Sequence, residues 1–307
     1  MIRIENLSKS YNGQLAVNNI SFEVKTGEVL GFLGPNGAGK TTTMKIITCF
    51  MPPTSGEVYV DDLNICDHSL EIRKKIGYLP EHTALYQDMN VIDYLAYVAE
   101  LREIPAGKRR GRIREMVDLC GLSEVRPKNI GELSKGFRQR VALAQAMIHD
   151  PDILILDEPT IGLDPNQIVE IRGLIKQLGR EKTVILSTHI LSEVQAVCSR
   201  VIIINKGSLV ADGTPTELTG NLQGEETVYL ELKGTSPDFR PALEGLSGVD
   251  EIVEEMPLDG RTVYRIESKK EDLREELFHL AVRQGWTILE LRREQTSLED
   301  VFRELTK

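Results

Sequence analysis

Short apolar runs of strand length alternate with helical stretches over about the first 220 residues of the chain. The runs Leu30–Leu33, Ile153–Leu156 and Val184–Leu186 are continuously apolar, as expected for strands that are covered on both faces. This alternation is typical of an α/β domain. The strands that the pattern predicts are Ile2–Glu5, Ser21–Val24, Glu28–Leu33, Glu57–Val60, Ile76–Leu79, Ile153–Asp157, Val184–Ser187 and Val201–Asn205.

The strand pattern stops between about residues 84 and 150, where apolar residues recur at i, i+3 and i+4. The stretches Val91–Glu103, Arg110–Cys120 and Ser134–His149 are therefore predicted to be helices of an insert within the α/β domain. The basic segment Pro105–Arg112 (PAGKRRGR) is interpreted as a solvated connection between helices, in preference to a binding patch.

A second domain is predicted at residues 221–307, after the turn sequence Asp212–Pro215. Its predicted strands and helices follow the order βαββαβ of a ferredoxin-like unit. The strands are Thr227–Leu232, Val249–Val253, Thr262–Ile266 and Thr287–Leu291; the helices are Pro241–Leu246 and Glu271–Gln284, and an amphipathic stretch Ser297–Leu305 follows.

Composition limits the possible partners. From Asn221 onward the chain has 12 Lys and Arg against 20 Asp and Glu, which accounts for −8 of the net charge of −10. Phosphate backbones bind clustered Lys and Arg, so we expect no nucleic-acid partner. No window approaches the roughly 20 apolar residues of a membrane span, and Met1–Ile4 leads straight into a strand, so any membrane role is expected to come through a partner. The scattered cysteines fit a reducing cytosol.

A phosphate-binding loop follows the apolar strand at Val29–Leu33. The segment from Gly34 to Thr41 fits G-x-x-x-x-G-K-[ST] and opens a helical stretch, which is the context that this motif requires. Its backbone N–H groups and the helix N-terminus are expected to hold phosphates, Lys40 to reach the β- and γ-phosphates, and Thr41 to bind Mg²⁺. The predicted nucleotide-binding residues are Gly34, Pro35, Asn36, Gly37, Ala38, Gly39, Lys40, Thr41 and Thr42.

Two acids end the buried strand at Ile153–Asp157. Asp157 is predicted to hold Mg²⁺ and Glu158 to polarise the attacking water as a general base. Alone, such a pair could be a helix cap or a solvated turn. Ser134 is placed to cap the helix that follows it, and its alternative role, with Gly136, is a second anion site for a nucleotide bound on another copy.

With these motifs in this order, residues 1 to about 220 resemble an ABC transporter ATPase, a P-loop NTPase with a helical insert. The resemblance implies that Tyr11 stacks on adenine, that Leu133–Arg140 is the signature, that Asp164 belongs to the D-loop and that His189 contacts the γ-phosphate. Two departures stand out. Glu81 replaces the usual Gln of the Q-loop, where its carboxylate can still bind Mg²⁺, and the signature reads LSKGF with Lys135 in place of Gly.

The signature LSKGFRQRV, the loop GYLPE and the C-terminal run Ser297–Phe302 resemble the exporter-type (ABC-2) subfamily. Within it, the runs Leu163–Arg172 and Thr183–Ser192 look closest to ATPase subunits associated with gliding motility. The resemblance implies ATP and Mg²⁺ as ligands, a head-to-tail dimer with a second copy, a separate ABC-2 permease, and a position on the cytoplasmic face of the membrane. Apolar residues past Glu81 (Leu85, Tyr86, Met89, Val91 and Tyr94) are candidates for docking on that permease or for the core of the insert. The alternatives are a soluble ABC ATPase that acts on ribosomes or DNA, and a regulatory protein that binds ATP without hydrolysing it.

Overall fold

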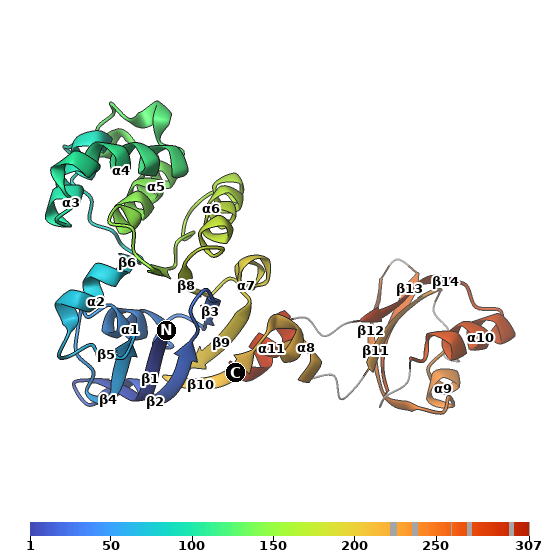
Figure 1. The fold of residues 1–307 in the computed structure, drawn as a ribbon. Helices are drawn as coiled ribbons and strands as arrows, with labels where there is room; N and C mark the ends of the chain where they lie inside the picture. Colours follow the sequence, from blue (N-terminus) through green and yellow to red (C-terminus); the bar gives the residue numbers. More distant parts are fainter. Residues whose placement is uncertain (222–225, 235–238, 259, 269–271, 295–297, 307) are drawn as a thin grey trace. The chain divides into compact units, whose positions relative to one another are not determined.

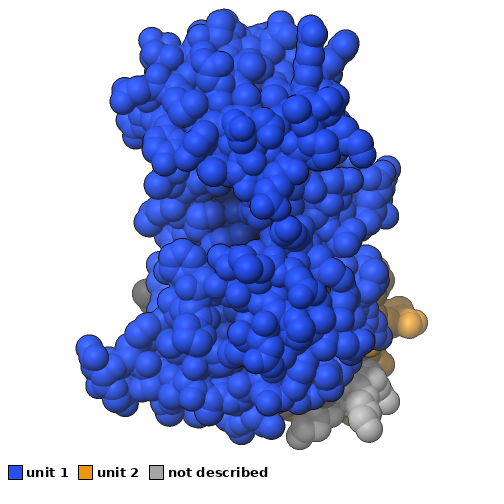
Figure 2. All heavy atoms as spheres, turned by 60° about the vertical axis from the view of Figure 1, so that its left-hand side comes forward, with its two compact units in different colours: residues 1–215, 305–307 blue, residues 216–304 orange. Residues whose placement is uncertain are grey.

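Two compact units make up the chain (Figure 1). The computed structural model describes all residues except 222–225, 235–238, 259, 269–271, 295–297 and 307. Unit 1 comprises residues 1–215 and 305–307, and unit 2 comprises residues 216–304. Figure 2 shows one face of unit 1, which is hollowed between its upper and lower parts.

The larger sheet of unit 1 is parallel apart from one edge. Neighbouring strands are parallel throughout, except that β10 pairs antiparallel with β9. The strand order is β10 (Ser208–Gly213), β9 (Arg200–Asn205), β3 (Val29–Leu33), β8 (Thr183–Thr188), β7 (Ile153–Asp157) and β6 (Ile76–Leu79). Strands β3, β7 and β8 are buried along their whole length, as their apolar sequences predict.

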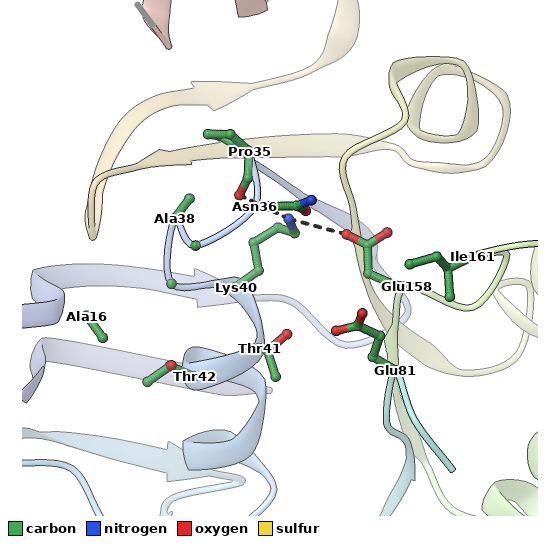
Figure 3. A pocket seen from close by; sticks show the side chains of 12 residues that line it. Ala16, Pro35, Asn36, Ala38, Lys40, Thr41, Thr42, Glu81, Glu158 and Ile161 are labelled. Carbon is green, nitrogen blue, oxygen red and sulfur yellow. Dashed lines mark hydrogen bonds and ion pairs between the residues drawn. The ribbon is translucent and has the colours of Figure 1, made fainter. Parts of the chain in front are cut away.

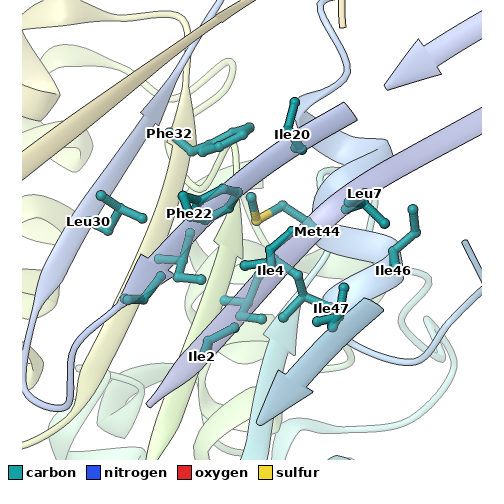
Figure 4. Packing of buried hydrophobic residues seen from close by; sticks show 14 of the residues in the cluster. Ile2, Ile4, Leu7, Ile20, Phe22, Leu30, Phe32, Met44, Ile46 and Ile47 are labelled. Atoms are coloured by element: carbon teal, nitrogen blue, oxygen red, sulfur yellow. The ribbon is translucent and has the colours of Figure 1, made fainter. Parts of the chain in front are cut away.

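The second sheet of unit 1 is antiparallel, and the main core lies between it and the parallel sheet. Helix α1 (Lys40–Ile47) contributes Met44, Ile46 and Ile47 to this core, and the rings of Phe22 and Phe32 lie 5.5 Å apart in it (Figure 4). The strand order is β2 (Gln14–Val24), β1 (Ile2–Tyr11), β4 (Ser55–Val60) and β5 (Leu63–Asn64). Strands β1 and β2 are longer than their alternating patterns predict.

The predicted helical insert contains α3 (Val91–Leu101), α4 (Ala106–Leu119) and α5 (Lys135–Met147). The interpretation of Pro105–Arg112 as a connection between helices is wrong, because this segment forms the first half of α4. Its basic side chains are partly used in packing: Arg112 donates hydrogen bonds to the carbonyl oxygens of Met147 and Ile148. Outside the insert, unit 1 also contains α2 (Ser69–Lys75), α6 (Pro165–Leu178) and α7 (Leu191–Val197), and α8 (Pro215–Asn221) leads into unit 2.

Unit 2 has the predicted βαββαβ order and a fully antiparallel sheet. Its strand order is β12 (Val249–Leu258), β13 (Arg261–Ser268), β11 (Glu226–Lys233) and β14 (Ile288–Glu294); its helices are α9 (Phe239–Glu244), α10 (Arg274–Gln284) and α11 (Leu298–Leu305). Leu230, Tyr264, Ile266 and Leu277 are among its core residues. Glu271 and Ser297, which begin two of the predicted segments, lie outside the described residues.

Candidate active site

The predicted site residues follow four strands that end at the same edge of the parallel sheet. Strand β3 leads into the loop at Gly34, β6 ends just before Pro80 and Glu81, β7 ends at Asp157, and β8 ends just before His189. Carboxyl ends of parallel strands form the usual ligand crevice of an α/β sheet, because side chains distant in sequence meet there. The fold therefore brings together groups that are far apart in the sequence.

The loop between β3 and α1 is shaped by glycine. Gly39 has φ +110°, and a Cβ at this position would overlap the carbonyl oxygen of Ala16, so any side chain here would be both strained and obstructed. The bend begins α1 at Lys40, whose Nζ donates to the carbonyl oxygens of Gly34 (2.7 Å) and Pro35 (3.3 Å). The lysine ammonium is thus held inside the loop.

A pocket of about 330 Å³ opens over this loop (Figure 3). Figure 3 shows Glu158 and Ile161 on one side of it, with Glu81 beside them and the loop residues opposite. Its lining residues are Ala16, Pro35, Asn36, Gly37, Ala38, Gly39, Lys40, Thr41, Thr42, Glu81, Glu158 and Ile161. Eight of these are predicted nucleotide-binding residues, so the sequence motif and the cavity coincide.

Lys40, Glu158 and His189 form a connected group. Lys40 Nζ lies 3.2 Å from Glu158 Oε1, and both side chains are 6% exposed. His189 Nδ1 lies 2.8 Å from Glu158 Oε2. A carboxylate accepts hydrogen bonds, so Nδ1 donates here and Nε2 remains available to another group. Glu158 also has φ +49°, an uncommon backbone conformation for a residue other than glycine.

Asp157 is fully buried next to this group. Its Oδ1 accepts a hydrogen bond from the hydroxyl of Ser187, and its Oδ2 has no hydrogen-bond partner. Burial raises the pKa of the Asp157 carboxyl, and the nearby hydroxyls of Ser187 and Thr41 offset only part of that rise. An unpartnered, buried carboxylate oxygen beside a threonine hydroxyl fits a hydrated divalent cation, because both groups supply hard oxygen ligands.

Gly34, Asp157 and His189 adjoin residues that line the pocket without lining it themselves, and four other predicted residues do not line it either. Tyr11 is exposed at the end of β1, and its hydroxyl donates to Met51 Sδ at 3.0 Å. Ser134 caps α5 by accepting from the Phe137 amide, and Asp164 caps α6 by accepting from the Gln167 amide at 3.0 Å. The fourth, Gly136, lies so close to the side-chain amide of Gln167 that a Cβ there would overlap it.

Sequence reasoning missed Ala16 and Ser187, and it placed Ile161 in the D-loop without predicting that this residue lines the pocket. Ala16 and Ile161 line the pocket, and Ser187 holds both Asp157 and the backbone N–H of Glu158. Ser187 carried a weak signal, because it is a polar residue near the end of an otherwise apolar strand. Ala16 carried none, since its place over the loop depends on how β2 crosses α1.

Comparison with known proteins places the chain in a family. Residues 17–161 match the family model described as ABC transporter. The chain is 32% identical over 314 residues to the linearmycin resistance ATP-binding protein LnrL of Bacillus subtilis, a match that covers 100% of this chain and 98% of that protein. The chain belongs to the ABC transporter ATP-binding proteins. The activity expected of this ATP-binding protein is ATP hydrolysis coupled to transport.

Other relatives agree with this assignment. The ATP-binding protein is 32% identical to the Nod factor export ATP-binding protein I of Burkholderia lata, over 99% of this chain and 96% of that one. It is 36% identical to the lipopolysaccharide export system ATP-binding protein LptB of Escherichia coli K12, over 77% and 97% respectively. A dimeric, post-hydrolysis structure of the cassette MJ0796 bound to ADP and Pi matches 70% of this chain and 98% of its own, with a TM-score of 0.65 and 28% identity. The predicted P-loop ATPase fold is confirmed.

None of the described helices combines the length and the apolar character that crossing a membrane requires.

Proposed function

We propose that this ATP-binding protein is the motor of an exporter of the ABC-2 type, and that it hydrolyses ATP at the edge of the parallel sheet. The observation that carries the proposal is the group formed by Lys40, Glu158 and His189, which stands at the rim of a glycine-rich phosphate loop. The matches to the Nod factor export protein over 99% of this chain and to the lipopolysaccharide export protein LptB over 77% of it support the export direction. The closer resemblance to gliding-motility subunits stays a prediction.

In the proposed reaction the loop from Gly34 to Thr42 holds the phosphates of ATP, and Lys40 leaves its loop carbonyls to pair with the β- and γ-phosphates. Mg²⁺, held by Thr41 and Asp157 with Glu81 beside them, would neutralise charge on the phosphate oxygens. Glu158 accepts a proton from the attacking water. The new bond forms between the water oxygen and the γ-phosphorus, the bond from the γ-phosphorus to the bridging oxygen breaks, and ADP and phosphate leave.

His189 has a second role in this scheme. Its Nδ1–H donates to Glu158, which fixes the direction of the general base, and its Nε2 is left to interact with the γ-phosphate of the bound nucleotide. Positioning and charge neutralisation supply most of the rate in phosphoryl transfer, so the geometry of this pair matters more than the strength of the base.

A second copy of the chain completes the proposed site. Ser134 and Gly136 stand at the N-terminus of the 13-residue helix α5, where partial positive charge and free backbone N–H groups favour an anion, yet neither residue lines the pocket of its own chain. In a head-to-tail dimer they and Asp164 would face the nucleotide of the other copy. Tyr11 would stack on the adenine of a bound nucleotide. The dimeric structure of the MJ0796 cassette supports this arrangement.

We assign permease docking to the surface between α2 and α3. A groove of about 630 Å³ there is lined by Leu70, Arg73, Lys74, Leu101, Arg102, Glu103 and His149. Among the earlier docking candidates, Val91 and Tyr94 are buried in the insert, whereas Tyr86 is 57% exposed and stands 5.7 Å from the ring of Tyr97. A permease segment that is both apolar and acidic would match the apolar and basic side chains of this groove. Such a partner would hold the protein on the cytoplasmic face of the membrane.

The test is capture of the ATP-bound dimer with its partner. A tagged Glu158→Gln variant should bind ATP, hydrolyse it about 10²–10³-fold more slowly than the unmodified chain, and accumulate as a dimer, because only the general base is removed. Isolated from membranes of its native host in mild detergent, it should bring a polytopic membrane protein with it.

The matched control is Glu231→Gln, which changes a buried glutamate of unit 2 that pairs with Arg261. This control should turn over ATP normally and capture no more partner than the unmodified chain does. Normal turnover by Glu158→Gln would remove Glu158 from its role. Capture of ribosomal or DNA-repair proteins without a membrane protein would leave the ATPase chemistry in place and overturn the transport assignment.

A further inference from the structure

Glu193 is a buried carboxylate that the proposed reaction does not use. It lies in the first turn of α7 and is 1% exposed. Burial of a carboxylate is costly unless hydrogen bonds and opposite charge compensate it. Its Oε1 accepts from the hydroxyl of Thr160, its Oε2 accepts from the hydroxyl of Thr188 at 2.8 Å, and Arg172 stands 3.9 Å from Oε1.

The two threonines lie beside the catalytic pair, Thr160 in the loop after β7 and Thr188 at the end of β8. Thr160 follows Glu158 by two residues, and Thr188 directly precedes His189. Both hydroxyls are buried, and the Thr188 oxygen also accepts from the backbone N–H of Ile190 at 3.0 Å. One carboxylate therefore connects the loop after β7 to the end of β8, directly before His189.

The side chains of the catalytic pair also meet directly, where His189 Nδ1 lies 2.8 Å from Glu158 Oε2. A further contact behind this pair restrains the rotation of one segment relative to the other. The backbone of Glu158 also needs support, because its φ of +49° is uncommon outside glycine and persists only where the surroundings enforce it. Ser187 provides that support on the strand side, and Thr160 is placed to provide it on the loop side.

We propose that Glu193 is a positioning residue for hydrolysis: by holding Thr160 and Thr188 it fixes the loop of Glu158 against the loop of His189. The proposal rests on the hydrolytic role given above to Glu158. Glu193 does not touch the pocket, so it acts on the rate through the catalytic pair and leaves the phosphate loop unchanged. A structural role alone would instead lower stability, or lower affinity and rate together.

The test compares Glu193→Gln and Glu193→Ala by single-turnover hydrolysis, ATP affinity and thermal unfolding. Misplacement of a catalytic group by about 1 Å can cost about 10²-fold in rate. We expect Glu193→Ala to slow hydrolysis about 30-fold and Glu193→Gln, which keeps one acceptor oxygen, about 5-fold, with Kd for ATP within about twofold of the unmodified chain. The near-isosteric variants Thr160→Val and Thr188→Val should each slow hydrolysis and leave the affinity for ATP unchanged. They provide the test if Glu193→Ala does not fold.

A double variant supplies a readout that a purely structural residue would not give. If Glu193 works through Glu158, the double variant should hydrolyse ATP less than about twofold more slowly than Glu158→Gln alone, because the effects of groups that act as a unit are not additive. Glu231→Gln, the same change at a buried glutamate of unit 2, should leave rate and affinity unchanged.

Two results would overturn the assignment: a rate in the Glu193 and threonine variants within twofold of the unmodified chain, or a loss of rate and affinity together with a lowered Tm. If the unmodified chain hydrolyses no ATP, the proposed function fails along with this inference. If it hydrolyses ATP and the variants match it, only the inference about Glu193 fails.

Discussion

The two units differ in where they bury polar side chains. In unit 1, Lys40, Asp157, Glu158 and Glu193 gather at and behind the edge where parallel strands end. In the described part of unit 2, the buried polar residues Glu231, Thr262 and Ser268 lie on the strands of an antiparallel sheet. Glu231 pairs there with Arg261 on the adjacent strand, and Thr262 donates to the carbonyl oxygen of Gly234.

The difference teaches how to separate function from packing. Buried charge costs free energy, and in unit 2 that cost is met by a neighbour across the sheet. In unit 1 the compensation is incomplete: Asp157 Oδ2 has no partner, and Lys40 is held by loop carbonyls that a phosphate can replace. Charge that is buried and left partly unsatisfied marks the place where a ligand is expected.

The largest effect should follow removal of the buried ammonium. Lys40→Ala is expected to raise the Kd for ATP by about 10³-fold, on the order of 4 kcal/mol, because charge-assisted hydrogen bonds to phosphate are lost. Binding of a fluorescent ATP analogue by titration measures it. Lys45→Ala, on the same helix, is the matched control and should change Kd less than twofold. Equal affinities in all three proteins would remove the loop from the nucleotide site and end the contrast between the units.

The second effect tests whether unit 2 is a separate packing unit. Leu230→Ala should lower the free energy of unfolding of unit 2 by about 3 kcal/mol, since Leu230 is 1% exposed on the interior strand β11. Trp286, the only tryptophan of the chain, packs against Phe239 at 4.9 Å in the core of this unit, so its fluorescence during urea unfolding reports on unit 2.

Leu289→Ala, at a 46% exposed position of β14, is the control and should cost less than about 1 kcal/mol. ATP affinity should stay unchanged in both variants. Loss of ATP binding together with the shift in the tryptophan transition would show that the two units are not independent, and the contrast between them would need revision.

The sequence predicted those features that are encoded locally. The motif at Gly34–Thr41 requires a strand before it and a helix after it, and both were visible in the hydrophobic pattern. The continuously apolar strand β7 likewise predicted the place of Asp157. The βαββαβ order of strands and helices in unit 2 could be predicted because the sequence of each element has its own periodicity.

Features that depend on packing between distant segments could not be predicted. Glu193 and Thr160 are 33 residues apart, and nothing in either sequence neighbourhood indicates that they meet. The basic segment of α4 was misinterpreted because its charges outweighed its helical register, while Arg112 gains carbonyl partners from the end of α5 only in the folded insert. Val91 and Tyr94 were candidates for a docking surface because apolar residues of a core and of an interface look alike in sequence, and only the fold shows that both are buried.

The smallest expected effect concerns His149, a half-buried polar side chain that stays neutral. His149 follows α5, and its Nε2 lies 3.1 Å from the carbonyl oxygen of Ile76, at the opposite end of β6 from Glu81. Burial, together with the nearby Arg102, lowers the pKa of His149 to about 4, against about 6.5 in an unfolded chain. The folded state therefore resists protonation, so the stability due to neutral His149 is complete above about pH 6.5 and is lost as the pH falls toward 4.

Allowing for its partial exposure, this loss should amount to about 1 kcal/mol between pH 7 and pH 4.5. His149→Gln should have a flatter dependence of unfolding free energy on pH over that window, measured by urea unfolding with far-UV circular dichroism. His279→Gln, at an exposed position of α10, should keep the dependence of the unmodified chain. Parallel curves for His149→Gln and the unmodified chain would mean that the folded protein admits the proton freely, and that burial of polar groups in unit 1 is costly only at the strand ends.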